Sequence, residues 1–531
     1  MRRVFTVLIF LLSFTVAQGE EFAGHTVVLD DKGKLLSWVD PQSNAYDHVV
    51  RLAWNFLLTK VQVEPNGLKS YYTYCCIDQR TFRGTEWPHN PAGFNAMLTD
   101  SASEYYAYSG DHRVIDVVKG LLDYQLAHGT TPAKWKWGNM PYASSDFGAT
   151  EYRGAHEDRY DPKSGQGRGD GVGVIEPDKS AELGTAYLKL YEITGEPRYR
   201  DAAIAIGNTL VHTVRRGDDE ESPWPFRVYA ESGKVREEYA SDEIAQIRLL
   251  GELVRLKLGQ VKDYKKTRDL AWQWVLAVPL KNNVWANYFE DITIKATLWN
   301  FNQYSAMETA RYLLDHPELD PEWRTHVAGL IAFTEKTFAN DIKEGFKGNE
   351  WGANAISEQL DYDYKMGSHT SRYASVLARW AEITQDGDAK EKAFRSLNWA
   401  TYMAGDSGAV KDQPKPGDNG LWFSDGYGDY IRHFLYAMGA QPEWAPPEED
   451  HLLRSTSVIR QVSYTPGQVK YETFDKSATE VLRLSFVPHS VKAGSKELAK
   501  RADLNGSGWT FDAKLKVLRI RHTASNSIQI Q

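Results

Sequence analysis

One short pattern recurs five times along the middle of the chain and separates stretches with helical periodicity. It is a turn rich in Gly, Asp and Pro, found at 109–113, 194–199, 258–264, 315–317 and 384–388. Glycine at the end of one helix and an acid or Pro at the start of the next are typical of a tight turn between helices. Because repeats of this kind constrain the whole fold, the pattern predicts a series of helical hairpins.

Amphipathic stretches flank each turn, with apolar residues at i, i+3, i+4 and i+7. They predict helix pairs over 97–109 with 112–128, 179–194 with 197–213, 241–258 with 263–277, 298–315 with 321–339, and 368–384 with 388–403. Two unpaired helical patterns remain, over 42–59 and 425–439, and they complete a sixth hairpin if the two ends of the series meet. We therefore predict a mainly α (α/α)6 toroid, with twelve helices in two concentric layers.

The connections between hairpins are much longer than the turns within them. They cover roughly 60–96, 129–178, 214–240, 278–297, 340–367 and 404–424, and the stretch 226–239 has the pattern of a β-hairpin. All of these connections emerge at one end of such a ring, and long loops in a compact domain are usually functional. We expect the substrate to enter at this rim, where the inner helices begin.

The last part of the chain has a different period. A Pro-rich stretch near 441–450 is followed by short alternating segments at 457–464, 469–473, 480–487, 507–511 and 516–522. This pattern predicts a toroid domain over 20–440, a linker over 441–450, and an antiparallel β-sandwich accessory domain over 451–531.

The first 19 residues have the composition of a secretory signal peptide. Arg2 and Arg3 precede an apolar run over 4–16, and small residues follow at 17 and 19. Such a run is too short to cross a bilayer. We expect it to be cleaved and the protein to be secreted or periplasmic, with no membrane span.

The charge argues against a nucleic-acid-binding protein, and the cysteine content argues against a disulfide-stabilised fold. The formal charge is −9, from 62 Lys and Arg against 71 Asp and Glu, so the basic surface typical of nucleic-acid binding is absent. Cys75 and Cys76 are the only cysteines, and as neighbours they cannot close a long loop. We predict no metal and no cofactor, and the oligomeric state stays open.

A leader sequence, a toroid of about 400 residues with aromatic rim loops and a trailing β-domain resemble the secreted six-hairpin carbohydrate-active enzymes. The resemblance covers nearly the whole chain but includes no short signature of one family. It implies a poly- or oligosaccharide substrate lying across the mouth of the ring, with acids at the inner-helix starts acting on it. Some polysaccharide lyases share this architecture, so hydrolysis and elimination both stay open.

Acidic residues at two predicted rim positions are candidates for catalysis. Glu176 and Asp178 end a Gly-rich loop and open a helix, and capping of that helix is the structural alternative. Glu290 and Asp291 lie among aromatic and Asn residues, a composition that suits a sugar site.

Two further groups open the last inner helices. His369, Arg372 and Tyr373 follow one another at i, i+3 and i+4, which predicts that they share a helical face. Arg holding a carboxylate, with His and Tyr moving protons, suits elimination next to a uronic acid. Asp425 begins the sixth inner helix in a Gly-rich stretch.

Aromatic residues are the candidates for sugar binding. The chain has 17 Trp and 29 Tyr, and six of the Trp fall in the long connections. We expect several of these to be partly exposed around one concavity, where their rings can stack on sugars. The predicted substrate-binding residues are Trp135, Trp137, Trp224, Trp285, Trp351, Trp422 and Tyr427.

The sequence favours a secreted enzyme that hydrolyses glycosidic bonds with two carboxylates, one protonating the leaving oxygen and one activating water or attacking. A lyase acting next to a uronic acid is the first alternative, and a sugar-binding protein without activity is the second. The substrate is a saccharide, which the lyase alternative requires to be acidic.

Overall fold

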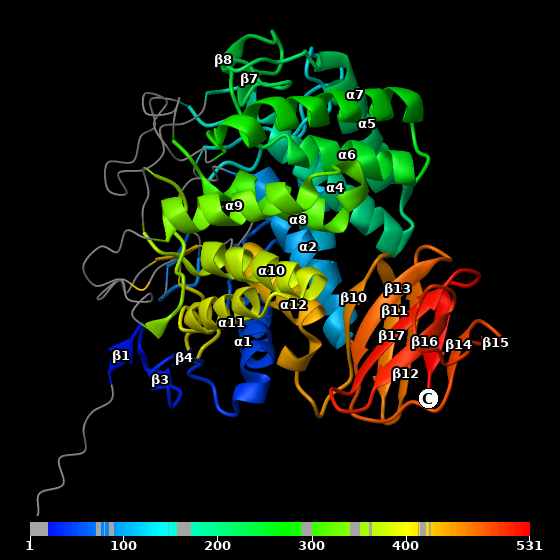
Figure 1. The fold of residues 1–531 in the computed structure, drawn as a ribbon. Helices are drawn as coiled ribbons and strands as arrows, with labels where there is room; N and C mark the ends of the chain where they lie inside the picture. The colour runs from blue at the N-terminus through cyan, green and yellow to red at the C-terminus, as the bar shows by residue number, and fades with distance from the viewer. Residues whose placement is uncertain are drawn as a thin grey trace, which may run out of the picture.

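Twelve α-helices within the described part of the chain pack as two concentric layers (Figure 1). The computed structural model describes residues 20–70, 76–78, 80–83, 90–146, 148–156, 171–288, 300–339, 351–360, 364–411, 414, 421–423 and 426–531. The inner helices are α2 (Pro91–Ser109), α4 (Pro177–Thr194), α6 (Ile244–Arg255), α8 (Gln303–Asp315), α10 (Gly367–Thr384) and α12 (Ile431–Ala440). The outer helices are α1 (Ala45–Thr59), α3 (Arg113–His128), α5 (Pro197–Thr213), α7 (Val261–Val275), α9 (Trp323–Phe338) and α11 (Gly387–Thr401).

Contacts between helices close the ring. Each inner helix contacts the next one along the chain, and α12 contacts α2. Each hairpin also pairs an inner helix with its outer neighbour, and the sixth pair joins α12 to α1 across the two ends of the toroid. The predicted (α/α)6 toroid is confirmed.

Burial separates the two layers. All twelve residues of α10 from Gly367 to Ala378 are buried, whereas α3 buries only six positions at helical spacing. A helix buried on all sides belongs to an interior and an amphipathic helix to a surface.

The turns follow the predicted chemistry. Gly110 and Gly195 end α2 and α4 in the left-handed conformation, with φ of 76° at both, and Pro197 opens α5. The start of α2 differs from the prediction by six residues, because the Asn90 side chain accepts from the Gly93 amide at 2.9 Å and caps a helix that begins at Pro91.

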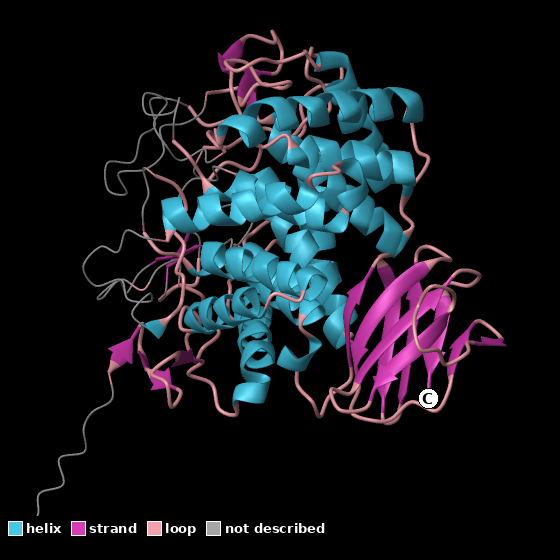
Figure 2. Ribbon diagram, viewed as in Figure 1, coloured by secondary structure: helices cyan, strands magenta, loops and turns pink. Residues whose placement is uncertain are grey.

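A β-sandwich follows the toroid (Figure 2). One sheet has the order β10–β13–β17–β16 and the other β11–β12–β18–β14–β15, and the pairs are antiparallel. The strands are β10 (His451–Ser455), β11 (Ile459–Thr465), β12 (Gln468–Thr473), β13 (Ala478–Arg483), β14 (Val491–Ala493), β15 (Lys496–Glu497), β16 (Gly508–Asp512), β17 (Val517–His522) and β18 (Ser527–Ile530).

The sandwich packs on the end of the ring where the inner helices finish (Figure 1). His451 stacks on Tyr108 with ring centroids 3.9 Å apart, and Arg454 binds Glu382 through two hydrogen bonds of 2.6 and 2.8 Å. Tyr464 donates to the carbonyl of Ala107. The β-domain therefore covers the short-turn end of the toroid.

Short strands decorate the long-loop end and the N-terminal segment. The hairpin predicted at 226–239 is present as β7 and β8, which join β6 in a three-stranded sheet just before α4. These strands are β1 (Glu21–Phe22), β2 (His25–Thr26), β3 (Val28–Leu29), β4 (Leu35–Leu36), β5 (Cys76–Asp78), β6 (Val174–Ile175), β7 (Arg227–Tyr229), β8 (Val235–Glu237) and β9 (Leu421–Phe423).

The described part of the chain contains no helix with the length and apolar content needed to cross a membrane. The predicted signal peptide, residues 1–19, lies outside the described residues and stays a prediction.

Candidate functional site

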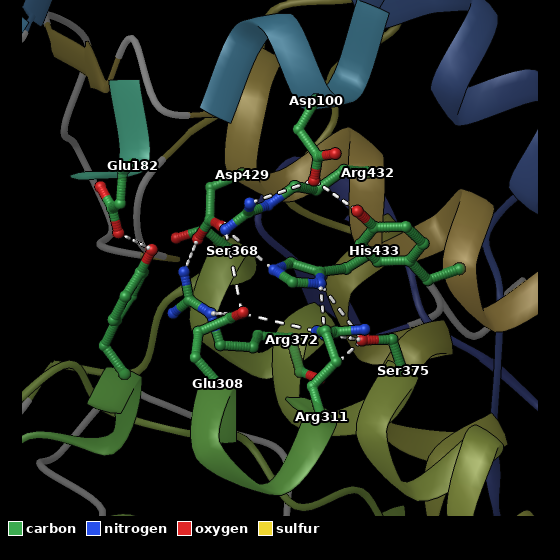
Figure 3. Close-up of polar contacts among 12 residues, drawn as sticks. Asp100, Glu182, Glu308, Arg311, Ser368, Arg372, Ser375, Asp429, Arg432 and His433 are labelled. Carbon is green, nitrogen blue, oxygen red and sulfur yellow. Dashed lines mark hydrogen bonds and ion pairs between the residues drawn. The ribbon is translucent and has the colours of Figure 1, made fainter. Parts of the chain in front are cut away.

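A layer of charged side chains fills the middle of the ring (Figure 3). We call it the polar layer, and every inner helix except α6 supplies it with residues drawn in the figure. Its members are Asp100 of α2, Glu182 of α4, Glu308 and Arg311 of α8, Arg372 and Ser375 of α10, and Asp429, Arg432 and His433 in and just before α12. Tyr304 of α8 and Tyr436 of α12 also belong to it, because they donate to Glu182 and Asp100.

Asp429 joins two arginines within this layer. Arg432 donates to its Oδ1 from Nε at 3.0 Å, and Arg372 donates to its Oδ2. Burial alone would raise the pKa of Asp429, but the two guanidiniums hold it well below its usual range. Asp429 is therefore a fixed negative charge in the centre of the ring.

Glu308 is surrounded by guanidiniums. Arg248 lies 3.2 Å from one carboxylate oxygen, and Arg311 and Arg372 each lie 3.5 Å from the other. Against the effect of burial, these arginines and Arg432 hold the pKa of Glu308 below its ordinary value. Glu308 thus forms ion pairs with several arginines.

His369 has a defined proton position at the start of α10. Its Nδ1 lies 2.9 Å from Nη1 of Arg372 and 2.7 Å from Nε2 of Gln303. Since a guanidinium can only donate, Nδ1 accepts and the ring proton sits on Nε2, 3.7 Å from Glu358. Burial and then Arg372 lower the pKa of His369 to about 3, so the imidazole is neutral at physiological pH.

Two carboxyls at the rim have contrasting surroundings, and we call Asp178 and Asp242 the rim acids. Asp178, in the first turn of α4, forms a 3.0 Å ion pair with Lys179, whose ammonium also donates to the Tyr288 carbonyl at 2.7 Å. Asp242, two residues before α6, is buried, and neither of its oxygens has a hydrogen-bond partner among the described residues.

The protonation of Asp242 follows from these surroundings. Burial, followed by repulsion from Glu182 and Asp178, holds the pKa of Asp242 well above its usual range. The next acid inward, Glu182, accepts from the hydroxyl of Tyr304 at 2.6 Å, and burial raises its pKa too. A neutral carboxylic acid therefore stands near an ion-paired carboxylate, an arrangement capable of acid–base chemistry.

The predicted catalytic residues separate into three groups. Asp178 is a rim acid, and His369 and Arg372 are in contact with each other. Glu176 instead accepts from Arg227 at 2.7 Å, which also binds Glu237 at 3.2 Å, so it joins the start of α4 to the β6–β7–β8 sheet. Glu290, Asp291 and Asp425 lie outside the described residues.

The prediction that Tyr373 shares a face with His369 and Arg372 is wrong. Its hydroxyl donates to Glu335 of the outer helix α9 at 2.6 Å and accepts from Asn354 at 2.9 Å. A residue directly after Arg372 is rotated by about 100° around the helix, which turns Tyr373 toward the outer layer.

The tryptophans expected around an exposed concavity are mostly buried, so that expectation is wrong for Trp137, Trp224, Trp285 and Trp351. Trp224 and Trp285 have no exposed surface, and the Trp224 indole donates to the Leu210 carbonyl at 2.9 Å. These rings anchor the connections on the helices, because a long loop needs apolar contacts to stay folded.

Three other predicted sugar-binding residues have different outcomes. Trp135 is half-buried, which is compatible with stacking. Tyr427 is fully buried and stacks on Phe56, with ring centroids 5.7 Å apart. The side chain of Trp422 lies outside the described residues.

The sequence interpretation missed Asp242, Glu182, Glu308, Arg432 and His433. One signal could have found Arg432 and His433: polar residues at i, i+3, i+4 and i+7 on a helix whose other positions are apolar or small. Asp429, Arg432, His433 and Tyr436 follow this spacing. Within the described residues, no cluster of three or more His, Cys, Asp or Glu is arranged to hold a metal ion.

Solved structures with the same architecture share little sequence with this chain. A D-mannose isomerase superposes with a TM-score of 0.54 at 10% identity, covering 74% of this chain and 97% of that one. The cellobiose 2-epimerase from Bacillus thermoamylovorans superposes with a TM-score of 0.52 at 12% identity, covering 75% and 99%. The chain has the fold of the six-hairpin toroid enzymes.

A family 76 glycoside hydrolase from a bovine Bacteroides thetaiotaomicron strain is also similar, with a TM-score of 0.49 at 11% identity, over 75% of this chain and 78% of that one. No family model and no curated protein matches the sequence. The isomerase and the epimerase show the fold alone, and the chemistry has to be argued from the site.

Proposed function

We propose that this protein is a carbohydrate-active enzyme that hydrolyses a glycosidic bond, with Asp242 as the proton donor and Asp178 as the carboxylate. The observation that carries this proposal is the contrast between the rim acids. Asp178 is ion-paired with Lys179, whereas burial and neighbouring acids keep Asp242 protonated. Glycoside hydrolysis needs such a pair, one carboxylic acid to protonate the leaving oxygen and one carboxylate to activate water or attack.

Their place in the fold supports the assignment. Both acids stand where inner helices begin, at the end of the ring opposite the β-domain, and each is only 1% exposed. Exclusion of water strengthens the electrostatic interactions of a charged site. Neighbours with the same fold are named as enzymes of sugars, and we extend only that general substrate class to this chain.

The test is an activity screen against neutral and acidic oligosaccharides, following the appearance of reducing ends. Asp242→Asn should lower the rate by about 100-fold to 10,000-fold, the contribution usual for a general acid. Asp219→Asn, an exposed acid in the connection after α5, is the matched control and should keep full activity. Equal loss in both variants, or less than tenfold loss in Asp242→Asn, would refute the assignment.

The second candidate is a reaction that starts by moving a proton next to a carbonyl or carboxyl group, as in sugar isomerisation, epimerisation or elimination. The neutral imidazole of His369, whose Nε2 lies 3.7 Å from Glu358, favours it. The elimination mechanism predicted from the sequence also used Tyr373 to move a proton, but the Tyr373 hydroxyl donates to Glu335 instead. Deuterium uptake from heavy water at a sugar carbon, or a new ultraviolet absorbance from an unsaturated uronate, would identify this class, and hydrolysis produces neither.

The third alternative, a sugar-binding protein without turnover, predicts that saccharides bind and that Asp242→Asn changes no rate. Calorimetric binding on the same panel, with no new reducing ends, no deuterium uptake and no new absorbance, separates it from both enzymatic candidates.

A further inference from the structure

A cavity of about 530 Å³ lies between the polar layer and the β-domain. Residues from all six inner helices form its wall, and residues 452–459 of β10, β11 and the segment between them form its floor. Asp315, at the end of α8, lines the cavity and its side chain is 53% exposed, so the space reaches solvent on that side. We call this space the floor cavity. It is on the opposite side of the polar layer from the rim acids.

Basic side chains reach the floor cavity from most of the elements around it. Five of the six inner helices supply one or more, and the β-domain supplies another. A set with one from each of these elements is Lys189 of α4, Arg248 of α6, Arg311 of α8, Arg379 of α10, Arg432 of α12 and Arg454 of β10.

The acids of the lining do not fully neutralise these cations. The lining contains seven Lys and Arg and seven Asp and Glu. Burial raises the pKa of Glu104 to about 7 and that of Glu192 to about 7, and it also raises the pKa of Glu182. Burial therefore favours the neutral forms of Glu104, Glu192 and Glu182, which leaves the seven cations of the lining less than fully balanced.

Arg248 has donors to spare. Among the described residues its only hydrogen bond joins Nη2 to Glu308 at 3.2 Å, although a guanidinium carries five N–H donors. Its side chain is 31% exposed, and it lines the floor cavity. Arg311 lies 3.5 Å from the same carboxylate, so the two guanidiniums are close neighbours.

We propose that the floor cavity is a second binding site, which takes a small molecule carrying one oxyanion group, held by Arg248 and Arg311. Guanidinium pairs are the side chains best matched to carboxylate and phosphate oxygens. The volume falls in the range of small-molecule sites and suits a single sugar acid or an inorganic oxyanion. Neither rim acid lines this site.

Calorimetry with three ligands tests the proposal: inorganic phosphate, glucuronate and glucose. Phosphate, glucuronate or both should bind, and glucose, which lacks the anion, should bind at least tenfold more weakly. Tighter binding of glucuronate than phosphate would identify a sugar acid as the ligand, and the reverse order would identify a free oxyanion.

Three substitutions test whether the anion binds in the floor cavity. Arg248→Gln should weaken binding by about tenfold or more, the effect expected for loss of a charge-assisted hydrogen bond. The exposed Arg216→Gln is the matched control and should leave it unchanged. Glu104→Gln removes a negative charge from the same wall and should tighten binding, a gain that misfolding cannot imitate. Equal affinity in Arg248→Gln and the unaltered protein, or glucose binding as tightly as glucuronate, would overturn the proposal.

Discussion

The toroid and the β-sandwich differ in what they bury. The centre of the ring holds Asp429, Arg372 and Glu308, each at most 3% exposed. The sandwich instead has an apolar core that includes Leu482, Ile520 and Val469. Buried charges cost free energy that apolar side chains of similar volume would not.

The two interiors contribute differently to stability. The sandwich buries apolar surface, which stabilises it directly, and its described buried charges include the pair of Glu480 and His522. The toroid instead buries a network of ion-paired charges, whose desolvation costs free energy. The charged centre of the toroid therefore has a cost in stability that the apolar core of the sandwich does not have, and the sandwich also covers the short-turn end of the ring.

Removing one carboxylate from the centre of the toroid should destabilise the protein more than a change in the sandwich. Asp429→Ala leaves Arg372 and Arg432 without the acid that they share, and loss of one partner from a buried pair costs about 3–5 kcal/mol. Urea unfolding measures the loss. The exposed Asp219→Ala should change stability by less than about 0.5 kcal/mol, and a similarly small change in Asp429→Ala would show that the network is not under this constraint.

A cavity in the sandwich should have a smaller effect of a different kind. Leu482 has no exposed surface, and Leu482→Ala should destabilise the protein by about 3 kcal/mol through lost burial and an unfilled space. Its effect on turnover per folded molecule should be small, since this residue lies in the accessory domain. A large fall in turnover without unfolding would mean that the sandwich takes part in the reaction.

The smallest expected effect is a dependence on pH within the sandwich. Burial opposes it, but the hydrogen bond and charge of Glu480 raise the pKa of His522, while burial raises the pKa of Glu480. Both folded-state values exceed the unfolded ones, so the folded state binds more protons. The stability from this pair is full at low pH and is lost as pH rises through the two folded values.

The double variant Glu480→Gln with His522→Asn should lose less stability as pH rises. The difference in unfolding free energy between about pH 5 and 8 should shrink by about 1 kcal/mol or less. The exposed His489→Gln, in the same domain, should leave this difference unchanged. The assigned shifts would be contradicted if the unfolding free energy of the unaltered protein, compared with that of the control variant, rose with pH.

The helical architecture could be predicted because it depends on local chemistry. Gly110 and Gly195 mark helix ends wherever the chain must turn in the left-handed conformation, and the sequence shows them directly. The start of α2 was missed because a single cap, Asn90, adds a turn to a helix that periodicity alone places later. Strands as short as β15, with two residues, leave no alternation to read.

The site was predicted only in part, because its chemistry depends on contacts between distant segments. Asp178 and His369 could be chosen from their places at helix starts. Nothing near Asp242 in the sequence indicates a protonated acid, since its pKa depends on burial and on Glu182 and Asp178 from another helix. Tyr373 is four residues after His369 but directly after Arg372, and the rotation of about 100° from Arg372 turns its hydroxyl toward Glu335 of the outer layer.

We propose that the rim keeps Asp242 protonated for catalysis at a cost in stability, and the unfolding free energy of Asp242→Asn measures that cost. The folded-state pKa of Asp242 is raised, so the unaltered protein loses stability as pH rises from about 4 toward that value, whereas Asn has no proton to lose. At about pH 8 the account predicts that Asp242→Asn is more stable than the unaltered protein by about 1–3 kcal/mol, although inactive. A variant that is less stable at this pH, or that keeps its activity, would contradict the account.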